Sequence, residues 1–349
     1  SPRVDPARAE DEPVLRALLR ESPMPSLVDL TFEREPDFFG ADVALGDPVD
    51  TLVARAPDGT AAGVGQRALR TVALAGTPEA VAYLGGLRLR PEQRASGAHA
   101  EAWRQMRRLH EASPTRLSLS SITDGNTRAR RLLTLGRPPV PRFEPLAEVA
   151  TLAFVAHRFV PQPTAVHVRP ARDAPEARAA LSPPEPLDLF PLADPFRLPG
   201  LRPEHVWIAE TSGETMGAMA VWDPSPVRQT VVRGYRGALR WGRPLANGAL
   251  VALGAPRLPS LRQPLASGMA AHAWARTPEA FADLVRAALR HARQRRLAFL
   301  LVALDRTDCR LATPRRGLHL DYASTLYTVR WDADAPRLRR PLHVELPQL

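Results

Sequence analysis

The chain has 349 residues, long enough for two ordinary domains with full hydrophobic cores. Its formal net charge is +10, and every basic residue is an arginine. The arginines are scattered without a helix-turn-helix, zinc or RNA-binding signature, so we expect no nucleic-acid partner. A single cysteine, Cys309, excludes an intrachain disulfide, and the histidines lack the paired spacing of metal ligands. The histidine spacing leads us to expect no metal. No segment approaches the length of a spanning helix and no apolar targeting segment opens the sequence, so we expect a cytoplasmic protein with no membrane partner.

The first predicted elements are helices followed by a hairpin. Residues Ala9–Arg20 place their aliphatic side chains on one side of a helix. Thr51–Arg55 and Ala61–Arg70 have strand character, and Ala56–Gly59 between them has the Pro-Asp-Gly signal of a hairpin turn. We expect a second helix between the first one and this hairpin.

The run Ala82–Arg104 predicts a strand, a polar loop and a helix that continues to about His110. Pro91 ends the strand because it cannot donate to the ladder. Unpaired amides and the helix dipole both favour an anion where such a loop enters a helix, and Gly97 allows the backbone to come close to it. This segment therefore predicts a pyrophosphate site.

A second strand and helix follow directly. Arg116–Ile122 predicts a strand, and Thr127–Leu135 predicts a short helix that Gly136 closes. Asn126 stands where a helix N-cap is expected. The last strand pair of this half is expected within Phe143–Val155.

The second half repeats this organisation. Val166–Asp173 resembles Arg3–Glu10, which suggests a duplicated fold. The remaining predicted elements are a hairpin of His205–Glu210 and Met216–Trp222, a strand Leu265–Trp274, a helix Pro278–Arg293, a strand Leu297–Leu304 and a closing strand Tyr322–Trp331. Only Ala275–Thr277 lies between the third of these strands and the helix, which leaves no room for a loop around a diphosphate.

The segment LRLRPEQRASGAHA resembles the acetyl-CoA-binding motif of the GCN5-related N-acetyltransferase (GNAT) superfamily, Arg/Gln-x-x-Gly-x-Gly/Ala. Arg94 and Gly97 match this motif, while His99 occupies its final small position. A second motif of the family, Asn-x-x-Ala-x-x-Leu-Tyr-x-x-x-Gly, is similar to the segment that starts at Asn126, although Leu133 stands in place of its tyrosine.

The resemblance implies an α+β fold of two tandem GNAT-like domains, each a mixed, mostly antiparallel sheet flanked by helices. We expect a catalytic domain at 1–157, a linker at 158–164, a degenerate copy at 165–335 and a tail at 336–349. The implied co-substrate is acetyl-CoA. Its implied contacts are Leu87, Arg88, Leu89, Arg94, Ala95, Ser96, Gly97, Ala98, His99, Ala100 and Asn126.

The family mechanism implies direct attack of an amine on the acetyl thioester, polarised by a backbone N–H around Leu87–Leu89. Leu133 leaves the position of the family's tyrosine acid vacant. Candidates for the base are Asp124, Glu33 and Tyr83. Each also has a structural interpretation. Asp124 could be a turn or cap residue, Glu33 a surface charge beside Arg34, and Tyr83 a core residue.

The charge distribution suggests the kind of acceptor. Residues 1–58 contain 13 acids and six arginines, while residues 59–160 contain seven acids and 15 arginines. This division suits a polyanionic cofactor on one side and a small cationic amine on the other. The second domain would shape the acceptor pocket or form a homodimer interface. Two alternatives stay open: a non-catalytic acyl-CoA-binding module, and an acetyltransferase of protein or peptide amines.

Overall fold

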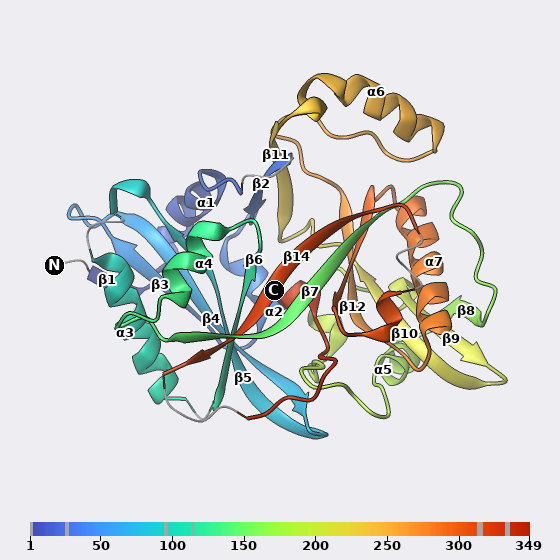
Figure 1. Ribbon diagram of the computed structural model, residues 1–349, viewed down its shortest axis with the longest axis horizontal. Helices are drawn as coiled ribbons and strands as arrows, with labels where there is room; N and C mark the ends of the chain where they lie inside the picture. The colour runs from blue at the N-terminus through green and yellow to red at the C-terminus, as the bar shows by residue number, and fades with distance from the viewer. Residues whose placement is uncertain (1–2, 25–27, 94–96, 114, 313–316, 332–335) are drawn as a thin grey trace.

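The structure, a computed structural model, describes residues 3–24, 28–93, 97–113, 115–312, 317–331 and 336–349. Within these residues, a twelve-stranded sheet runs through the whole molecule, with helices on both of its faces (Figure 1). Its strands follow the order β1-β3-β4-β5-β6-β14-β7-β13-β12-β10-β9-β8. A separate two-stranded sheet joins β2 to β11. The pairing is antiparallel except between β5 and β6 and between β12 and β13.

The first half forms the left part of Figure 1. Its elements are β1 (Arg3–Pro6), α1 (Glu12–Arg20), β2 (Val28–Glu33), α2 (Asp42–Leu45), β3 (Val49–Arg55), β4 (Ala61–Leu74), β5 (Thr77–Leu89), α3 (Ala98–Glu111), β6 (Leu117–Thr123), α4 (Thr127–Thr134) and β7 (Arg142–Val155).

The second half forms the right part of the same view. Its elements are β8 (His167–Pro170), α5 (Ala174–Ala180), β9 (Val206–Thr211), β10 (Glu214–Trp222), β11 (Gln229–Tyr235), α6 (Ala238–Ala252), β12 (Ser267–Ala275), α7 (Pro278–Gln294), β13 (Phe299–Asp305) and β14 (His319–Arg330).

The strand order is symmetric about its centre, and the two halves exchange their last strands there. The first half contributes β1, β3, β4, β5 and β6 from one edge, and the second contributes β8, β9, β10, β12 and β13 from the other. Between them, β14 lies beside β6 and β7 lies beside β13. The two exchanged strands pair with each other along almost their full length. Neither half therefore completes its sheet without a strand from the other.

Several predicted elements are confirmed, and the exchange explains one that is wrong. The first helix, the first hairpin and the helices after the two parallel strands all form at or close to the predicted residues. A strand pair within Phe143–Val155 does not form, because this segment is the single strand β7 and its partners come from the second half. The second helix expected before the hairpin is the four-residue α2, and β2, which was not expected, precedes it.

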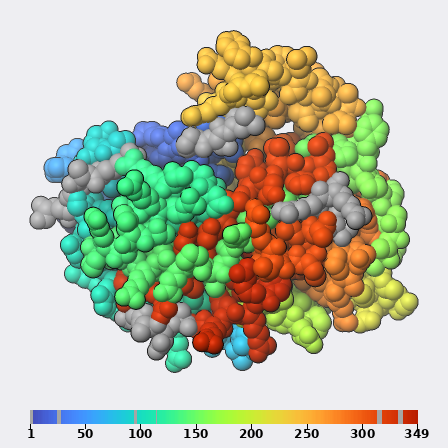
Figure 2. Space-filling model, viewed as in Figure 1, coloured from blue at the N-terminus to red at the C-terminus, as the bar shows by residue number. Residues whose placement is uncertain are grey.

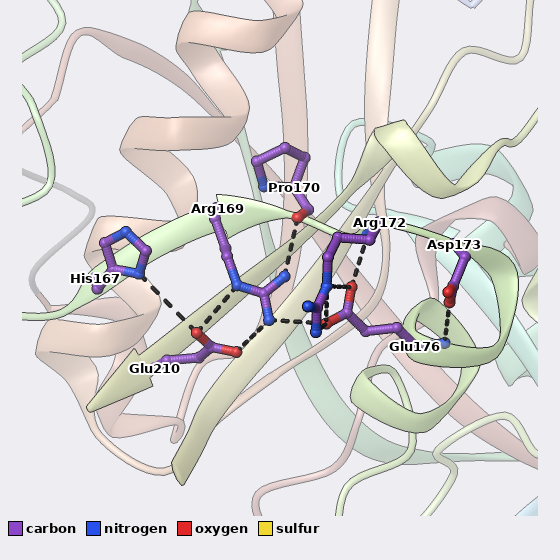
Figure 3. Close-up of polar contacts among 7 residues, drawn as sticks. All are labelled: His167, Arg169, Pro170, Arg172, Asp173, Glu176 and Glu210. Carbon is purple, nitrogen blue, oxygen red and sulfur yellow. Dashed lines mark hydrogen bonds and ion pairs between the residues drawn. The ribbon is translucent and has the colours of Figure 1, made fainter. Parts of the chain in front are cut away.

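Equivalent ion-pair clusters hold the two outer edges of the sheet. Figure 3 shows Arg169 of β8 between Glu210 of β9 and Glu176 of α5, at 2.6 and 2.8 Å. At the opposite edge, Arg55 of β3 bonds Asp11 before α1 at 2.8 Å, and it also bonds Asp5 of β1. Arginine forms several directed bonds at once, so one side chain ties an edge strand to both its neighbour and its helix.

Candidate functional site

The two parallel strands of the first half separate in the middle of the sheet. Strands β5 and β6 pair only over Val81–Tyr83 and Leu117–Leu119. Beyond Tyr83, β5 continues along β4, while β6 continues along β14. Two strands that diverge in this way expose backbone groups on their facing edges, which is where an extended ligand can insert.

A β-bulge lies just after the point of divergence. One residue of β4, Gly65, stands opposite two residues of β5, Gly86 and Leu87. Gly86 has φ +66°, and both bulge residues are exposed. A Cβ atom on Gly86 would lie 3.3 Å from Oε1 of Gln66, so glycine is required here by both conformation and space. The sequence carries a signal for this bulge, because a Gly-Gly pair inside a strand indicates one.

Tyr83 is the one base candidate that lies at the divergence. Its ring is buried on β5, and its hydroxyl is 2.6 Å from the Ser121 hydroxyl of β6. The guanidinium of Arg70 covers the ring at 4.2 Å from its centroid. Two hydroxyls in contact across the diverging strands can pass a proton between them. Sequence reasoning missed Ser121, which carries no motif of its own.

Asp124 and Glu33 lie elsewhere. Asp124 is exposed at the end of β6, where its backbone and carboxylate bond to Ala323 and Thr325 of β14. Glu33 belongs to β2, not to a helix as expected, and its buried carboxylate pairs with Arg233 of β11. Among the described residues neither carboxylate contacts Tyr83, and each has a structural partner.

The connection from β5 to α3 spans the eight residues 90–97. Three of the expected cofactor contacts, Arg94, Ala95 and Ser96, lie outside the described residues. Gly97 precedes α3 with φ +82°, a conformation that glycine adopts freely. The connection therefore ends on the N-terminus of a fourteen-residue helix, as the sequence predicts.

His99 and its neighbours form the first turn of α3. Burial lowers the pKa of His99, which keeps the imidazole neutral. Nε2 of this ring accepts a hydrogen bond from the Trp103 indole at 3.0 Å. The imidazole is thus held along its own helix by the residue one turn later. Ala98, the first residue of the helix, is buried, and Ala100 is half-buried.

Helix α4 begins where β6 ends. Oδ1 of Asn126 accepts a hydrogen bond from the Ala129 amide at 3.1 Å, so Asn126 is an N-cap. Leu133, at the position of the family's tyrosine, is buried beside Trp103 and Phe143 in the core beneath α3 and α4. Leucine has no acidic proton, so this position supplies no acid.

Arginines gather on the face of the sheet opposite α3. Arg34 donates to Gln66 at 2.6 Å and to Asp42 at 3.1 Å. Burial lowers the pKa of Arg34, and it raises the pKa of Asp42. Gln66 is also the neighbour of the bulge, so this network reaches the point where the strands diverge.

Three further arginines of this group form no ion pair with a carboxylate among the residues that the structure describes, although the charge of Glu345 acts on Arg70. Arg70 donates to the carbonyl oxygens of Leu45 and Gln348, and Arg228 donates to Pro347. Burial lowers the pKa of Arg70 to about 9 and that of Arg228 to about 10, and it also lowers the pKa of Arg88. All three stay charged at neutral pH. Of these three, only Arg88 was expected at the site. Arg70 was not singled out, and Arg228 comes from the other half of the chain.

The second half contains the same backbone device, but protein atoms occupy it. One residue of β10, Met219, stands opposite His272 and Ala273 of β12, and His272 has φ +48°. Its backbone amide donates to the carboxylate of Glu345, at 3.0 Å to Oε2. Nε2 of His343 contacts the same oxygen at 2.8 Å. A buried carboxylate from the C-terminal segment therefore fills the second bulge.

The pKa values of this cluster follow from its burial. Burial lowers the pKa of His272, although Glu345 opposes the shift. Burial opposes ionisation of Glu345, but His272 and His343 together lower its pKa. The connection that follows this bulge is also short, since only Arg276 and Thr277 separate β12 from α7. Thr277 caps α7 through a bond from the Ala280 amide.

No protein-family model matches the chain, and no curated protein sequence is significantly similar to it. Solved structures do resemble it. Saccharomyces cerevisiae N-myristoyltransferase with bound myristoyl-CoA aligns at a TM-score of 0.57 and 11% identity, covering 94% of this chain and 82% of its own. The GCN5-related glucosamine N-acetyltransferase region of a fungal multi-domain β-N-acetylglucosaminidase aligns at a TM-score of 0.58 and 13% identity, covering 94% of this chain and 38% of its own.

Both alignments extend over the two halves, because each covers nearly all of this chain. At such low identity the likeness concerns the fold. The protein therefore has the GNAT fold in a tandem arrangement.

Proposed function

We propose that the protein is an acetyl-CoA-dependent N-acetyltransferase that acetylates a primary amine of a small acceptor. The observation that carries this proposal is the exposed bulge at Gly86 and Leu87, followed by a connection that ends on the N-terminus of α3. Two solved structures with this fold support it, an N-myristoyltransferase with bound myristoyl-CoA and a glucosamine N-acetyltransferase.

The bulge suits a thioester, because a strand that departs from regular pairing leaves a backbone amide free for a new acceptor. In this proposal the backbone around Leu87–Leu89 polarises the thioester carbonyl. The residues that lead to Gly97 and the N-terminus of α3 hold the pyrophosphate. Residues 1–157 would then be the catalytic domain, and residues 165–335 a copy whose bulge is filled by Glu345.

The reaction forms a C–N bond and breaks a C–S bond. The neutral amine attacks the thioester carbon, and the tetrahedral intermediate expels the thiolate of coenzyme A. The proton lost by the amine passes along the Tyr83–Ser121 hydroxyl pair to water, and the departing thiolate of coenzyme A takes up a proton from water. A thiol of pKa about 8.5 can leave without a positioned acid, so the buried Leu133 does not prevent the reaction.

The charge of the site points to an acceptor different from the cationic one expected from the sequence. The acids of residues 1–58 that lie near the bulge are paired, as Asp42 is with Arg34. Arg70, Arg88 and Arg228 add positive charge with no paired carboxylate among the described residues. We therefore propose that the acceptor carries a carboxylate or another anionic group beside its amine.

The test combines calorimetry with a thiol-release screen. Titration with acetyl-CoA should show one site per chain, and Gly97→Glu should abolish it. The screen should pair each amino acid with its decarboxylated amine, for example lysine with cadaverine, and the amino acid should react faster. No binding of acetyl-CoA would overturn the proposal. Binding without turnover across the panel would favour an acyl-CoA-binding module, and turnover of peptides alone would favour a protein acetyltransferase. A faster reaction of the decarboxylated amines would restore the cationic acceptor.

A further inference from the structure

Helix α6 projects from the molecule with a row of apolar side chains toward solvent. It stands apart from the sheet at the top of Figure 1 and forms a separate ridge in Figure 2. None of its residues is buried. Trp241 is 79% exposed and Leu245 is 82% exposed. Together with Ala238, Ala249 and Ala252, they recur every three or four residues, so they form one stripe along the helix, and all five are exposed.

The inner side of α6 contacts the protein through polar and aliphatic groups. Oδ1 of Asn247 accepts a hydrogen bond from the Leu258 amide at 2.8 Å. The guanidinium of Arg243 lies 5.4 Å from the centroid of the Tyr235 ring, and it also donates to the hydroxyl of Ser260. Leu250 packs against a small core cluster that includes Ala255 and Phe299. Two sides of the helix are therefore apolar, and the protein covers only one of them.

The sequence of α6 does not favour a helix without a partner. Its fifteen residues include Pro244 and two glycines, Gly242 and Gly248. Each glycine costs roughly 1 kcal/mol relative to alanine, and an interior proline costs about 3 kcal/mol. Most helices gain their stability by packing an apolar face against something else. Nothing within the described residues covers the stripe of α6.

The surroundings of α6 are strongly basic. Between Asp223 and Glu279 the chain has eight arginines and no acidic residue. Two of them pair with acids of the first half, because Arg233 contacts Glu33 and Arg236 contacts Asp29.

Three others are exposed on α6 or on the segment that returns beside it, without a carboxylate partner among the described residues: Arg240, Arg257 and Arg262. Leu261, which lies next to the last of these, is 53% exposed. The apolar stripe is therefore bordered by uncompensated positive charge.

We propose that α6 and the returning segment 257–262 bind the surface of a bilayer that contains anionic lipids. Trp241 and Leu245 would enter the boundary between headgroups and acyl chains, and Arg240, Arg257 and Arg262 would contact the headgroup phosphates. Nucleic acid would engage the arginines but leaves an aliphatic stripe uncovered. A second copy of this chain would bring two acid-free surfaces together, and their like charges repel.

This proposal concerns binding on a surface. No helix in the part of the chain that the structure describes is long and apolar enough to cross a bilayer. The sequence expectation of no membrane partner considered spanning segments, whereas α6 combines apolar and basic residues in the pattern of a helix that lies in the interface. The proposal is independent of the acetyltransferase activity.

The test is sedimentation of the full chain with vesicles of phosphatidylcholine alone and of phosphatidylcholine with 30% phosphatidylglycerol. We expect binding to the anionic vesicles, which weakens as salt is raised. Trp241→Ser with Leu245→Ser should reduce the partition coefficient roughly tenfold. Arg240→Gln, Arg257→Gln and Arg262→Gln together should weaken it by about fivefold per arginine. Leu318→Ser, at a leucine that is 49% exposed elsewhere, is the matched control and should bind like the wild type.

Equal binding of the wild type to neutral and anionic vesicles would overturn the proposal, and so would unchanged binding of the Trp241/Leu245 variant. The substituted side chains are exposed, so far-ultraviolet circular dichroism and thermal melting should show a folded protein in every case. Light scattering without vesicles gives one further outcome. A dimer that the Trp241/Leu245 variant dissociates would assign the stripe to a second copy and overturn the membrane proposal.

Discussion

The two halves of the sheet contain the same backbone device and differ in what fills it. In the first half, Gly86 and Leu87 form an exposed bulge where β5 and β6 diverge. In the second half, the equivalent bulge at His272 and Ala273 is buried beneath the carboxylate of Glu345. The comparison teaches that backbone topology creates the opportunity for a site. Whether it becomes one depends on the side chains that a distant segment brings to it.

The helices after the two bulges differ in the same sense. Helix α7 buries ten of its 17 residues, including Asp283, which accepts bonds from three consecutive backbone amides at 164–166. Helix α3 buries only Ala98, Trp103 and Met106. Helix α7 therefore contributes more of its residues to the core than α3 does.

The largest expected effect comes from closing the first bulge. Gly86→Val forces a branched side chain into φ +66° against Gln66, so acetyl transfer should fall 100-fold or more. Gly76→Val is the matched control, because Gly76 has φ +83° with open space around it. Both variants should lose about 1–3 kcal/mol of unfolding free energy, measured by urea titration. Equal loss of activity in the two would remove the special role of the bulge.

Removing the carboxylate from the second bulge should lower the stability of the protein and leave the number of acetyl-CoA sites at one. Glu345→Ala strips an acceptor from the His272 amide and from His343, which should lower the unfolding free energy by about 2–4 kcal/mol. Glu345→Gln retains an acceptor and should cost less. Calorimetry should still give one acetyl-CoA per chain, because the two-residue connection to α7 holds no diphosphate. A second site in Glu345→Ala would contradict this.

Acid should weaken the second half through His291. Burial, together with the nearby His205 and Arg295, lowers the pKa of this residue to about 4. The unfolded chain binds a proton near pH 6.5 while the folded protein does not, so stability falls as the pH drops from 6.5 toward 4. Urea titrations at pH 7 and pH 5 should differ by about 1–2 kcal/mol from this group. His291→Gln should reduce that difference, and an unchanged difference would assign it to other residues.

The smallest expected effects come from removing two helix caps, one in each half, which should differ in their effect on acetyl-CoA binding. Asn126→Ala and Thr277→Ala each remove a side-chain bond to an amide of the first turn, which costs about 1 kcal/mol. Only Asn126→Ala should also raise the dissociation constant for acetyl-CoA, by about threefold. Asn126→Ser restores the cap and shows whether the amide has a second role. Equal affinities in all three variants would leave Asn126 as a cap alone.

Much of the fold was predictable because its signals are local. The apolar spacing in Ala9–Arg20 and Pro278–Arg293 and the Pro-Asp-Gly turn each predict an element from residues that are close together in sequence. The strand exchange was not predictable. A strand such as β7 has the same alternating pattern whichever neighbour completes its ladder. Helix α6 was not predicted at all, because Pro244 and two glycines in its sequence disfavour a helix.

The sequence by itself determined the duplication, the strand–loop–helix that leads through Gly97, and the shortness of the connection before the helix Pro278–Arg293. Those features depend on the order and spacing of residues along the chain. Only the tertiary structure decided that Glu345 fills the second bulge and that Arg228 stands near the first. These partners are separated by scores to hundreds of residues in sequence, and only packing of the two halves places their charges together.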